Sequence, residues 1–368
     1  MGAESCTIMP KHPLIFTLCC LFLSAGLLAQ NAEISESDAV ALGRKLEMEV
    51  NSGNAAALFI AIDSAAFYGK IQAGSPVAQN PAFMKGFQES FSLLKFAGPV
   101  QEVVNKGSFH FLRSYEKDGN QHLLFRLLPG KGMNYYDFTL MKTRGIIKAS
   151  DVLLYINGEN LSVTMIDLIE TMANSVTNPQ ELSSLRSSMN KLTALKSKGD
   201  WVGVKAEYDQ LDEHLRQDKA LELVNIIACQ HIDNLAYKKA LEEYAHDFPG
   251  ATNAYLMMID MYSLNGEYER AIDVINKIDS ITGGDPALDY FRGNQYTNMK
   301  RSDSALQCYT RVFAYDPSLS NNVKKLVAYY INSGEKEKAR HVLAQYEKTA
   351  GAKTAFIDSL YAELPGLK

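Results

Sequence analysis

This chain of 368 residues has no excess of basic residues and almost no long apolar runs. Lysine and arginine together number 37, against 42 aspartates and glutamates, which gives a formal net charge of −5. Nucleic-acid-binding domains carry a basic face, so this balance argues against a nucleic-acid partner. Hydrophobic residues make up 46% of the chain and charged residues 21%, and these proportions exclude wholesale disorder and a collagen-like protein.

Sequence motifs for catalysis and for common cofactors are also missing. There is no G-x-x-x-x-G-K-[ST] phosphate loop, G-x-G-x-x-G fingerprint, H-E-x-x-H zinc motif or G-x-S-x-G nucleophile elbow. His214, His231, His246 and His341 lie on separate predicted helices and not at the spacing of metal ligands. We therefore expect no enzymatic activity, no cofactor and no metal.

Cysteine is scarce, and three of the five cysteines lie within the first 20 residues. The other two, Cys229 and Cys308, are far apart and belong to no C-x-x-C pair. A small secreted domain held together by disulfides would need more cysteines, and a zinc or redox site would need closer spacing. We expect two free, semi-buried thiols.

One apolar run, residues 13–29, follows Lys11 and precedes a polar, acidic segment. A basic start, an apolar centre and a small-residue end are typical of a signal peptide, here predicted over residues 1–29. The mature protein would then be periplasmic or secreted, without a stable membrane span. Because the run is near the lower length limit for crossing a bilayer, the alternative is an envelope protein anchored by an uncleaved N-terminal helix. Cys19 follows Leu18, so the run does not fit a lipoprotein signal.

Residues 31–158 show helical spacing first and strand alternation afterwards. Apolar residues recur at helical spacing behind Ser35, the stretch 55–62 is apolar, and Asn80-Pro81 begins a further helix. After Pro99 the period changes to two, and turn signals separate four expected strands, at 109–115, 121–128, 133–141 and 146–156. This order predicts a small α+β domain with a four-strand antiparallel sheet, ended by Gly158.

The order of these elements resembles the cone-shaped NTF2-like fold, in which a curved sheet wraps a helix. The resemblance implies that the domain is either an inert scaffold or a small-ligand-binding or weakly enzymatic unit. A ligand-binding or enzymatic domain would have a pocket surrounded by His110, Arg113, Arg126 and Asp151. In an inert scaffold, these side chains would instead face solvent or make cross-strand contacts.

The C-terminal half of the chain repeats with a period of 34 residues. Small residues, aromatic residues and turn residues recur together in three sets: Ala271, Ala305 and Ala339; Tyr262, Tyr296 and Tyr330; Gly266, Lys300 and Gly334. Each alanine would sit on a second helix where it crosses the first helix closely, so we expect all three alanines to be buried. Two degenerate units precede these, and in one of them the spacing between alanines shortens to 31.

This pattern resembles the tetratricopeptide repeat (TPR), whose period is 34 and whose signature residues are small and aromatic. The resemblance implies a mainly α, TPR-like solenoid of helical hairpins, with about five units at 185–217, 219–250, 252–284, 286–318 and 320–352. We predict a signal peptide (1–29), an α+β domain (31–158), a linker helix (159–180), the TPR array (181–352) and a C-terminal capping helix (353–368). The whole order resembles exported bacterial proteins that serve as interaction scaffolds.

In such an array the first helices of each unit line an inner groove, which is the expected site for a partner. Counting from the alanines gives these candidate groove residues: Asn225, Cys229, Leu256, Asp260, Tyr290, Asn294, Asn298, Lys324 and Asn332. Asparagine and tyrosine side chains are suited to hydrogen bonding with a peptide backbone. The chaperone-binding clamp of this family is only loosely matched, because Tyr290 stands where its lysine would be. We expect an unidentified protein or peptide partner.

Overall fold

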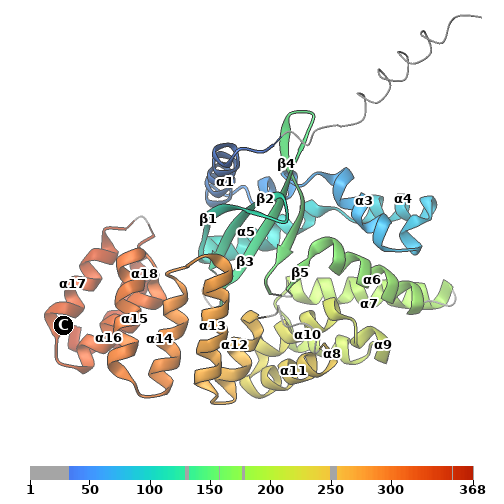
Figure 1. Ribbon diagram of the computed structural model, residues 1–368. Coiled ribbons are helices and arrows are strands. Elements are labelled where there is room, and N and C mark those ends of the chain that lie inside the picture. Colours follow the sequence, from blue (N-terminus) through green and yellow to red (C-terminus); the bar gives the residue numbers. More distant parts are fainter. Residues whose placement is uncertain are drawn as a thin grey trace, which may run out of the picture.

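The computed structural model describes residues 33–128, 132–156, 158–175, 179–248, 255–349 and 351–367. The predicted signal peptide lies outside these residues. The chain is mostly helical with one small antiparallel sheet (Figure 1), as the sequence predicts at this coarse level. Among the described helices, none has the length and apolar character needed to cross a bilayer.

Five helices and two short 3₁₀ segments precede the sheet. They are α1 (Glu36–Asn51), α2 (Ala56–Ile60), α3 (Ser64–Gly74), η1 (Val77–Gln79), α4 (Pro81–Ser90), η2 (Leu93–Phe96) and α5 (Ala97–Lys106). Both predicted caps are confirmed: the side chain of Ser35 accepts a hydrogen bond from Asp38 N, and that of Asn80 accepts from Ala82 N and Phe83 N. The prediction that strand alternation begins directly after Pro99 is wrong, because residues 97–106 form the helix α5. Pro99 sits in its first turn, where proline is tolerated.

The sheet has five strands in the order β1-β2-β3-β4-β5, each antiparallel to its neighbours. The four predicted strands are β1 (Ser108–Lys117), β2 (Asn120–Leu128), β3 (Asn134–Thr143) and β4 (Ile146–Leu154). The prediction that the sheet ends at Gly158 is wrong, because one more short strand, β5 (Glu159–Asn160), follows that glycine. Gly158 adopts φ 71°, a left-handed conformation that suits glycine, and the chain turns back beside β4.

The N-terminal helices cover one face of this sheet. Phe125 lies at the centre of that core, with ring centroids 5.0 Å from Phe109, 5.4 Å from Phe111 and 5.6 Å from Phe138. Helix α1 packs against β1 and β2 (Figure 1). The centre of the sheet on this side is therefore packed with aromatic side chains.

The remaining chain forms consecutive helical pairs. After α6 (Leu161–Ser175), these pairs are α7 (Pro179–Ser197) with α8 (Trp201–Asp209), α10 (Lys219–Ile232) with α11 (Asn234–Asp247), α12 (Tyr255–Leu264) with α13 (Tyr268–Thr282), α14 (Leu288–Asn298) with α15 (Ser302–Tyr315), and α16 (Ser320–Asn332) with α17 (Lys336–Glu347). The short helix α9 (Glu213–Arg216) interrupts the series, and α18 (Thr354–Glu363) with η3 (Pro365–Leu367) follows it. We call these five pairs the helical array.

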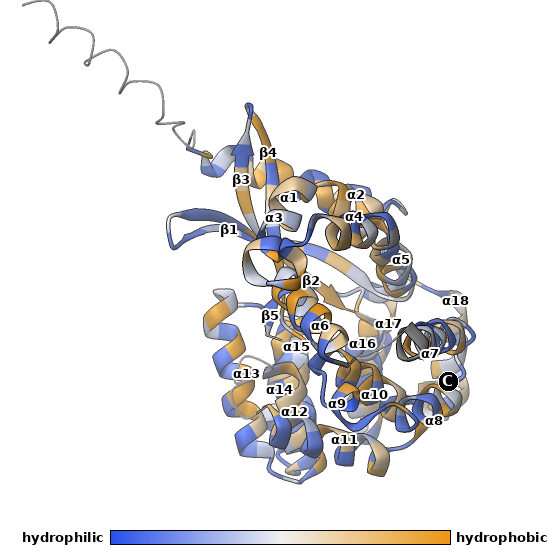
Figure 2. Cartoon of the chain, turned by 90° about the vertical axis from the view of Figure 1, so that its right-hand side faces the viewer, coloured by the Kyte–Doolittle hydropathy of each residue, from blue (hydrophilic) through white to orange (hydrophobic). Residues whose placement is uncertain are grey.

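The 34-residue frame has a physical counterpart in the array. Ala271, Ala305 and Ala339 are 0%, 3% and 0% exposed, which confirms their predicted burial. The turn positions of the same three units all have positive φ: 76° at Gly266, 59° at Lys300 and 80° at Gly334. Hydrophobic and hydrophilic residues alternate along α13 (Figure 2), as expected of a helix with one buried face.

The array covers the second face of the sheet. Along β2, Leu123 and Leu127 belong to the aromatic core, whereas Leu124 and Leu128 share a second core with α12, α13 and α14. The buried guanidinium of Arg126 is ion-paired with Asp285, which precedes α14, and Tyr135 Oη donates a hydrogen bond of 2.7 Å to the same carboxylate. The predicted boundary at residue 158 therefore runs through a shared core.

Candidate functional site

Two adjoining cavities lie between the sheet and the first helices of the array pairs. One has a volume of about 380 Å³ and the other of about 530 Å³. They share five lining residues: Gly132, Gln230, Ile259, Asp260 and Phe291. We call the two together the interdomain cleft, since both the sheet and the array contribute its walls.

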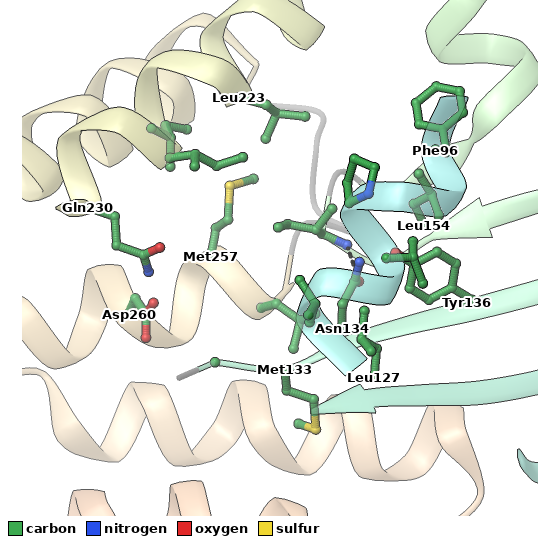
Figure 3. A pocket seen from close by; sticks show the side chains of 18 of the residues that line it. Phe96, Leu127, Met133, Asn134, Tyr136, Leu154, Leu223, Gln230, Met257 and Asp260 are labelled. Carbon is green, nitrogen blue, oxygen red and sulfur yellow. Dashed lines mark hydrogen bonds between the residues drawn. The ribbon is translucent and has the colours of Figure 1, made fainter. Parts of the chain in front are cut away.

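The smaller cavity is apolar. The sheet side contributes Leu127, Leu154 and α-helical neighbours such as Val100, and the array contributes Leu223 and Met257. Figure 3 shows Leu223 and Met257 on the array, facing the labelled strand side chains across this space. Cavities of this size and composition are typical of sites that take an apolar group of a ligand.

Among the described residues that line the apolar cavity, Asp260 is the one with a charged side chain, and it also lines the larger cavity. Its Oδ2 atom accepts a hydrogen bond of 2.7 Å from Tyr237 Oη. Burial raises the pKa of the Asp260 carboxyl, and the hydrogen bond from Tyr237 partly opposes that rise. Burial and the nearby Asp260 charge also raise the pKa of Tyr237, so the phenol keeps its proton and acts as a donor.

The larger cavity is polar along α14. Tyr290, Asn294 and Asn298 recur every four residues and therefore line one face of that helix toward the cavity. Asn294 Oδ1 accepts a hydrogen bond of 2.9 Å from Tyr309 Oη, which holds the amide in place. The side-chain amides at this wall can pair with a peptide backbone.

Two buried polar atoms of the larger cavity have no hydrogen-bond partner within the described part of the chain. They are Asn322 Oδ1 and Ser108 Oγ, and both residues line the cavity. The amide nitrogen of Asn322 donates to the carbonyl oxygen of Tyr309 at 2.9 Å, so its Oδ1 atom is oriented but unsatisfied. A buried acceptor without a donor indicates a bound water or ligand group.

The predicted groove residues separate into two groups. Asp260, Tyr290, Asn294 and Asn298 line the larger cavity, and Leu256 lines the apolar cavity. The structure thus brings five of them together at the interdomain cleft.

The other predicted groove residues lie elsewhere. Asn225 and Cys229 line a third cavity of about 410 Å³ against α8 and α11. Only Asp233 separates α10 from α11, whereas three residues separate α14 from α15, so positions counted back from Ala240 fall on a different face of the first helix. Lys324 Nζ pairs with the carboxylate of Glu363 at 2.5 Å, since α18 lies beside α16. Asn332 is exposed at the end of α16.

None of the four residues of the enzymatic alternative lines any of the three cavities described above. His110 lies 3.3 Å from Glu47 and 3.9 Å from Asp316, measured between ring nitrogen and carboxylate oxygen. Arg113 donates to the carbonyl of Ile281 at 3.0 Å.

The remaining two of these four residues are fixed elsewhere. The ion pair described above holds Arg126, and Asp151 Oδ2 accepts from Ser162 Oγ at 2.5 Å. Each of the four groups is thus paired with a different neighbour.

Metal and thiol chemistry find no support among the residues that the structure describes. No group of three or more histidine, cysteine, aspartate or glutamate side chains there could hold a metal ion. Cys229 and Cys308 are free, as predicted, but they are fully buried rather than semi-buried. Burial raises the pKa of both thiols, so they are poor nucleophiles.

Sequence reasoning missed the apolar cavity. Its walls come from residues around position 100, 127, 154, 223 and 257, and no local pattern connects them. The sequence feature that could have indicated a second packed face of the sheet was the run of apolar residues in β2, which is buried on both faces. No family model matches the chain, and no curated protein matches it.

Proposed function

We propose that this chain is an exported, non-catalytic scaffold that binds a protein or peptide partner in the interdomain cleft. The observation that carries the proposal is the polar wall of α14, where Tyr290, Asn294 and Asn298 line a cavity of about 530 Å³. Asn322, with its unsatisfied Oδ1 atom, lines the same cavity. Together they supply donors and acceptors to an extended backbone.

We propose further that the array is a tetratricopeptide solenoid and that the N-terminal domain is NTF2-like. Five consecutive helical pairs, the buried alanines and the positive-φ turns at a spacing of 34 support the first assignment. A meander sheet with α1 packed against it supports the second. Export rests on the apolar run at residues 13–29.

The alternative function, small-ligand binding by the N-terminal domain, is favoured by one observation, the apolar cavity of about 380 Å³. Its enzymatic version gains nothing from His110, Arg113, Arg126 and Asp151, whose partners are given above. The aromatic side chains packed around Phe125 at the centre of the sheet favour the scaffold.

The test is a screen of residues 31–368 against a displayed peptide library, with two matched variants. Asn298→Arg extends a charged side chain into the polar cavity, and Asn332→Arg makes the same change at the exposed end of α16. We expect enriched peptides to bind the unchanged chain and Asn332→Arg equally, and Asn298→Arg at least tenfold more weakly.

Two results would contradict the proposal: an empty screen, or equal peptide binding by Asn298→Arg. Binding of an apolar fluorescent probe that Asn298→Arg leaves unchanged, without any peptide binding, would favour the small-ligand alternative instead.

A further inference from the structure

We infer that the interdomain cleft selects peptides in which a bulky apolar side chain stands next to a cationic group. The apolar side chain occupies the cavity of about 380 Å³, and the cation pairs with Asp260. This inference rests on the proposed function and names the chemistry of the partner.

The apolar half of the inference follows from size and lining. A cavity of about 380 Å³ has room for one large aromatic or aliphatic side chain, and most of its wall is hydrocarbon. Burial of such a side chain removes apolar surface of both partners from water. Small side chains would leave most of the cavity unfilled and lose the corresponding contacts.

The charged half follows from the surroundings of Asp260. Its Oδ2 atom is hydrogen-bonded to the neutral phenol of Tyr237, and no lysine, arginine or histidine of the described residues forms an ion pair with it. An uncompensated carboxylate in an apolar wall is costly, and a ligand cation at that position supplies the missing counter-charge. An anionic ligand, such as a fatty acid, would meet repulsion there.

The position of Asp260 determines the order of the two groups on the peptide. Because this residue lines both cavities, a cation that reaches it stands where the apolar cavity opens into the polar one. Figure 3 shows Asp260 beside Gln230 on the array, with Met257 next to them toward the apolar side chains. The apolar side chain and the cation therefore belong to neighbouring residues, and the backbone continues along the polar wall of α14.

The experiment measures binding of four labelled octapeptides to residues 31–368. The peptides carry Phe-Lys, Phe-Gln, Ala-Lys or Phe-Glu at their centre, in an otherwise identical Gly-Ser sequence with blocked ends. We expect the Phe-Lys peptide to bind about tenfold or more tightly than the Phe-Gln and Ala-Lys peptides, and the Phe-Glu peptide to bind most weakly.

A variant then assigns the charge preference. Asp260→Asn keeps an acceptor for Tyr237 but removes the charge, and it should bind the Phe-Lys and Phe-Gln peptides equally while still preferring Phe over Ala. Asp303→Asn, at an exposed carboxylate of α15, is the matched control and should bind as the unchanged chain does.

The outcomes separate this inference from the proposed function. Equal binding of all four peptides, weakened by Asn298→Arg, would overturn the inference and leave the scaffold function standing. No binding of any peptide, together with an empty library screen, would overturn both. The comparison of peptides on the unchanged chain decides the question even if Asp260→Asn does not fold.

Discussion

At the scale of the residue, the ionisation of Asp260 affects both the candidate site and the stability of the folded protein. Burial raises the pKa of its carboxyl, so the folded chain holds that proton more tightly than the unfolded chain does. The resulting stabilisation is fully present below the unfolded pKa, which is about 3.9. It is lost as the pH rises through the folded pKa, so the charged carboxylate destabilises the fold at neutral pH.

We therefore predict that Asp260→Asn stabilises the protein at pH 7, by about 1 kcal/mol. The difference should shrink as the pH falls toward about 4, because the carboxyl is then neutral in both states. Thermal unfolding of both proteins across this pH range measures it, with Asp303→Asn as the control. If Asp260→Asn instead destabilised the protein at pH 7, the folded protein would already contain a group that compensates the Asp260 charge.

A second residue-scale prediction concerns Ala305, which is 3% exposed on α15. Ala305→Leu overfills the crossing between α14 and α15 and should cost about 1–3 kcal/mol. Exposed Asn298→Ala should stay within about 0.5 kcal/mol. The sequence alone would make Asn294→Ala an equally good control. It is unsuitable because the Tyr309 hydroxyl donates a hydrogen bond to the Asn294 side chain. Urea midpoints compare the variants, and equal shifts would show that the crossing at Ala305 is not tight.

At the scale of the element, the helical pairs turn through one repeated backbone conformation. The residue five positions before Ala271, Ala305 and Ala339 has a positive φ in each of the three units, but it is a glycine in only two of these units. A side chain in this conformation costs about 1–2 kcal/mol, so Lys300 is strained where Gly266 and Gly334 are not.

Lys300→Gly should consequently stabilise the array by about 0.5–1 kcal/mol, since relief of the strain exceeds the added entropy of the unfolded glycine. Gly334→Ala makes the reverse change in the next unit and should destabilise it by a similar amount. Chemical denaturation measures both. A loss of stability in Lys300→Gly would show that the lysine side chain makes contacts that outweigh its backbone strain.

At the scale of the whole molecule, the sheet and the array form one structure because they share a core and a buried ion pair. Arg126 and Asp285 are 0% and 1% exposed, and they lie 159 residues apart in the chain. Removal of one partner leaves the other charge buried without compensation.

We predict that Asp285→Asn destabilises the protein by about 3–5 kcal/mol. The double variant Arg126→Met with Asp285→Leu should recover part of this loss, because it removes both charges but leaves the Tyr135 hydroxyl and Ala287 N without their acceptor. Circular dichroism and tyrosine fluorescence should follow one common unfolding transition in the unchanged chain. Separate transitions for sheet and array, or no penalty in Asp285→Asn, would show that the interface contributes little.

The sequence by itself determined the local elements. Ser35 and Asn80 cap helices through contacts with residues two or three positions away, and period-two alternation marks β1 to β4. The spacing of 34 between Ala271, Ala305 and Ala339 determined the helical pairs and four of the residues at the polar cavity. These features depend on neighbours within one or two helices, so a linear pattern carries them.

Only the tertiary structure decided how the two halves meet. The apolar cavity, the ion pair of Arg126 with Asp285 and the contact of Lys324 with Glu363 join residues far apart in the sequence, and such contacts leave no periodic signal. Asp260 is unremarkable on a helix taken alone. It becomes a candidate site because the fold places its carboxylate where the apolar and polar cavities meet, beside hydrocarbon side chains, where a charge needs a partner.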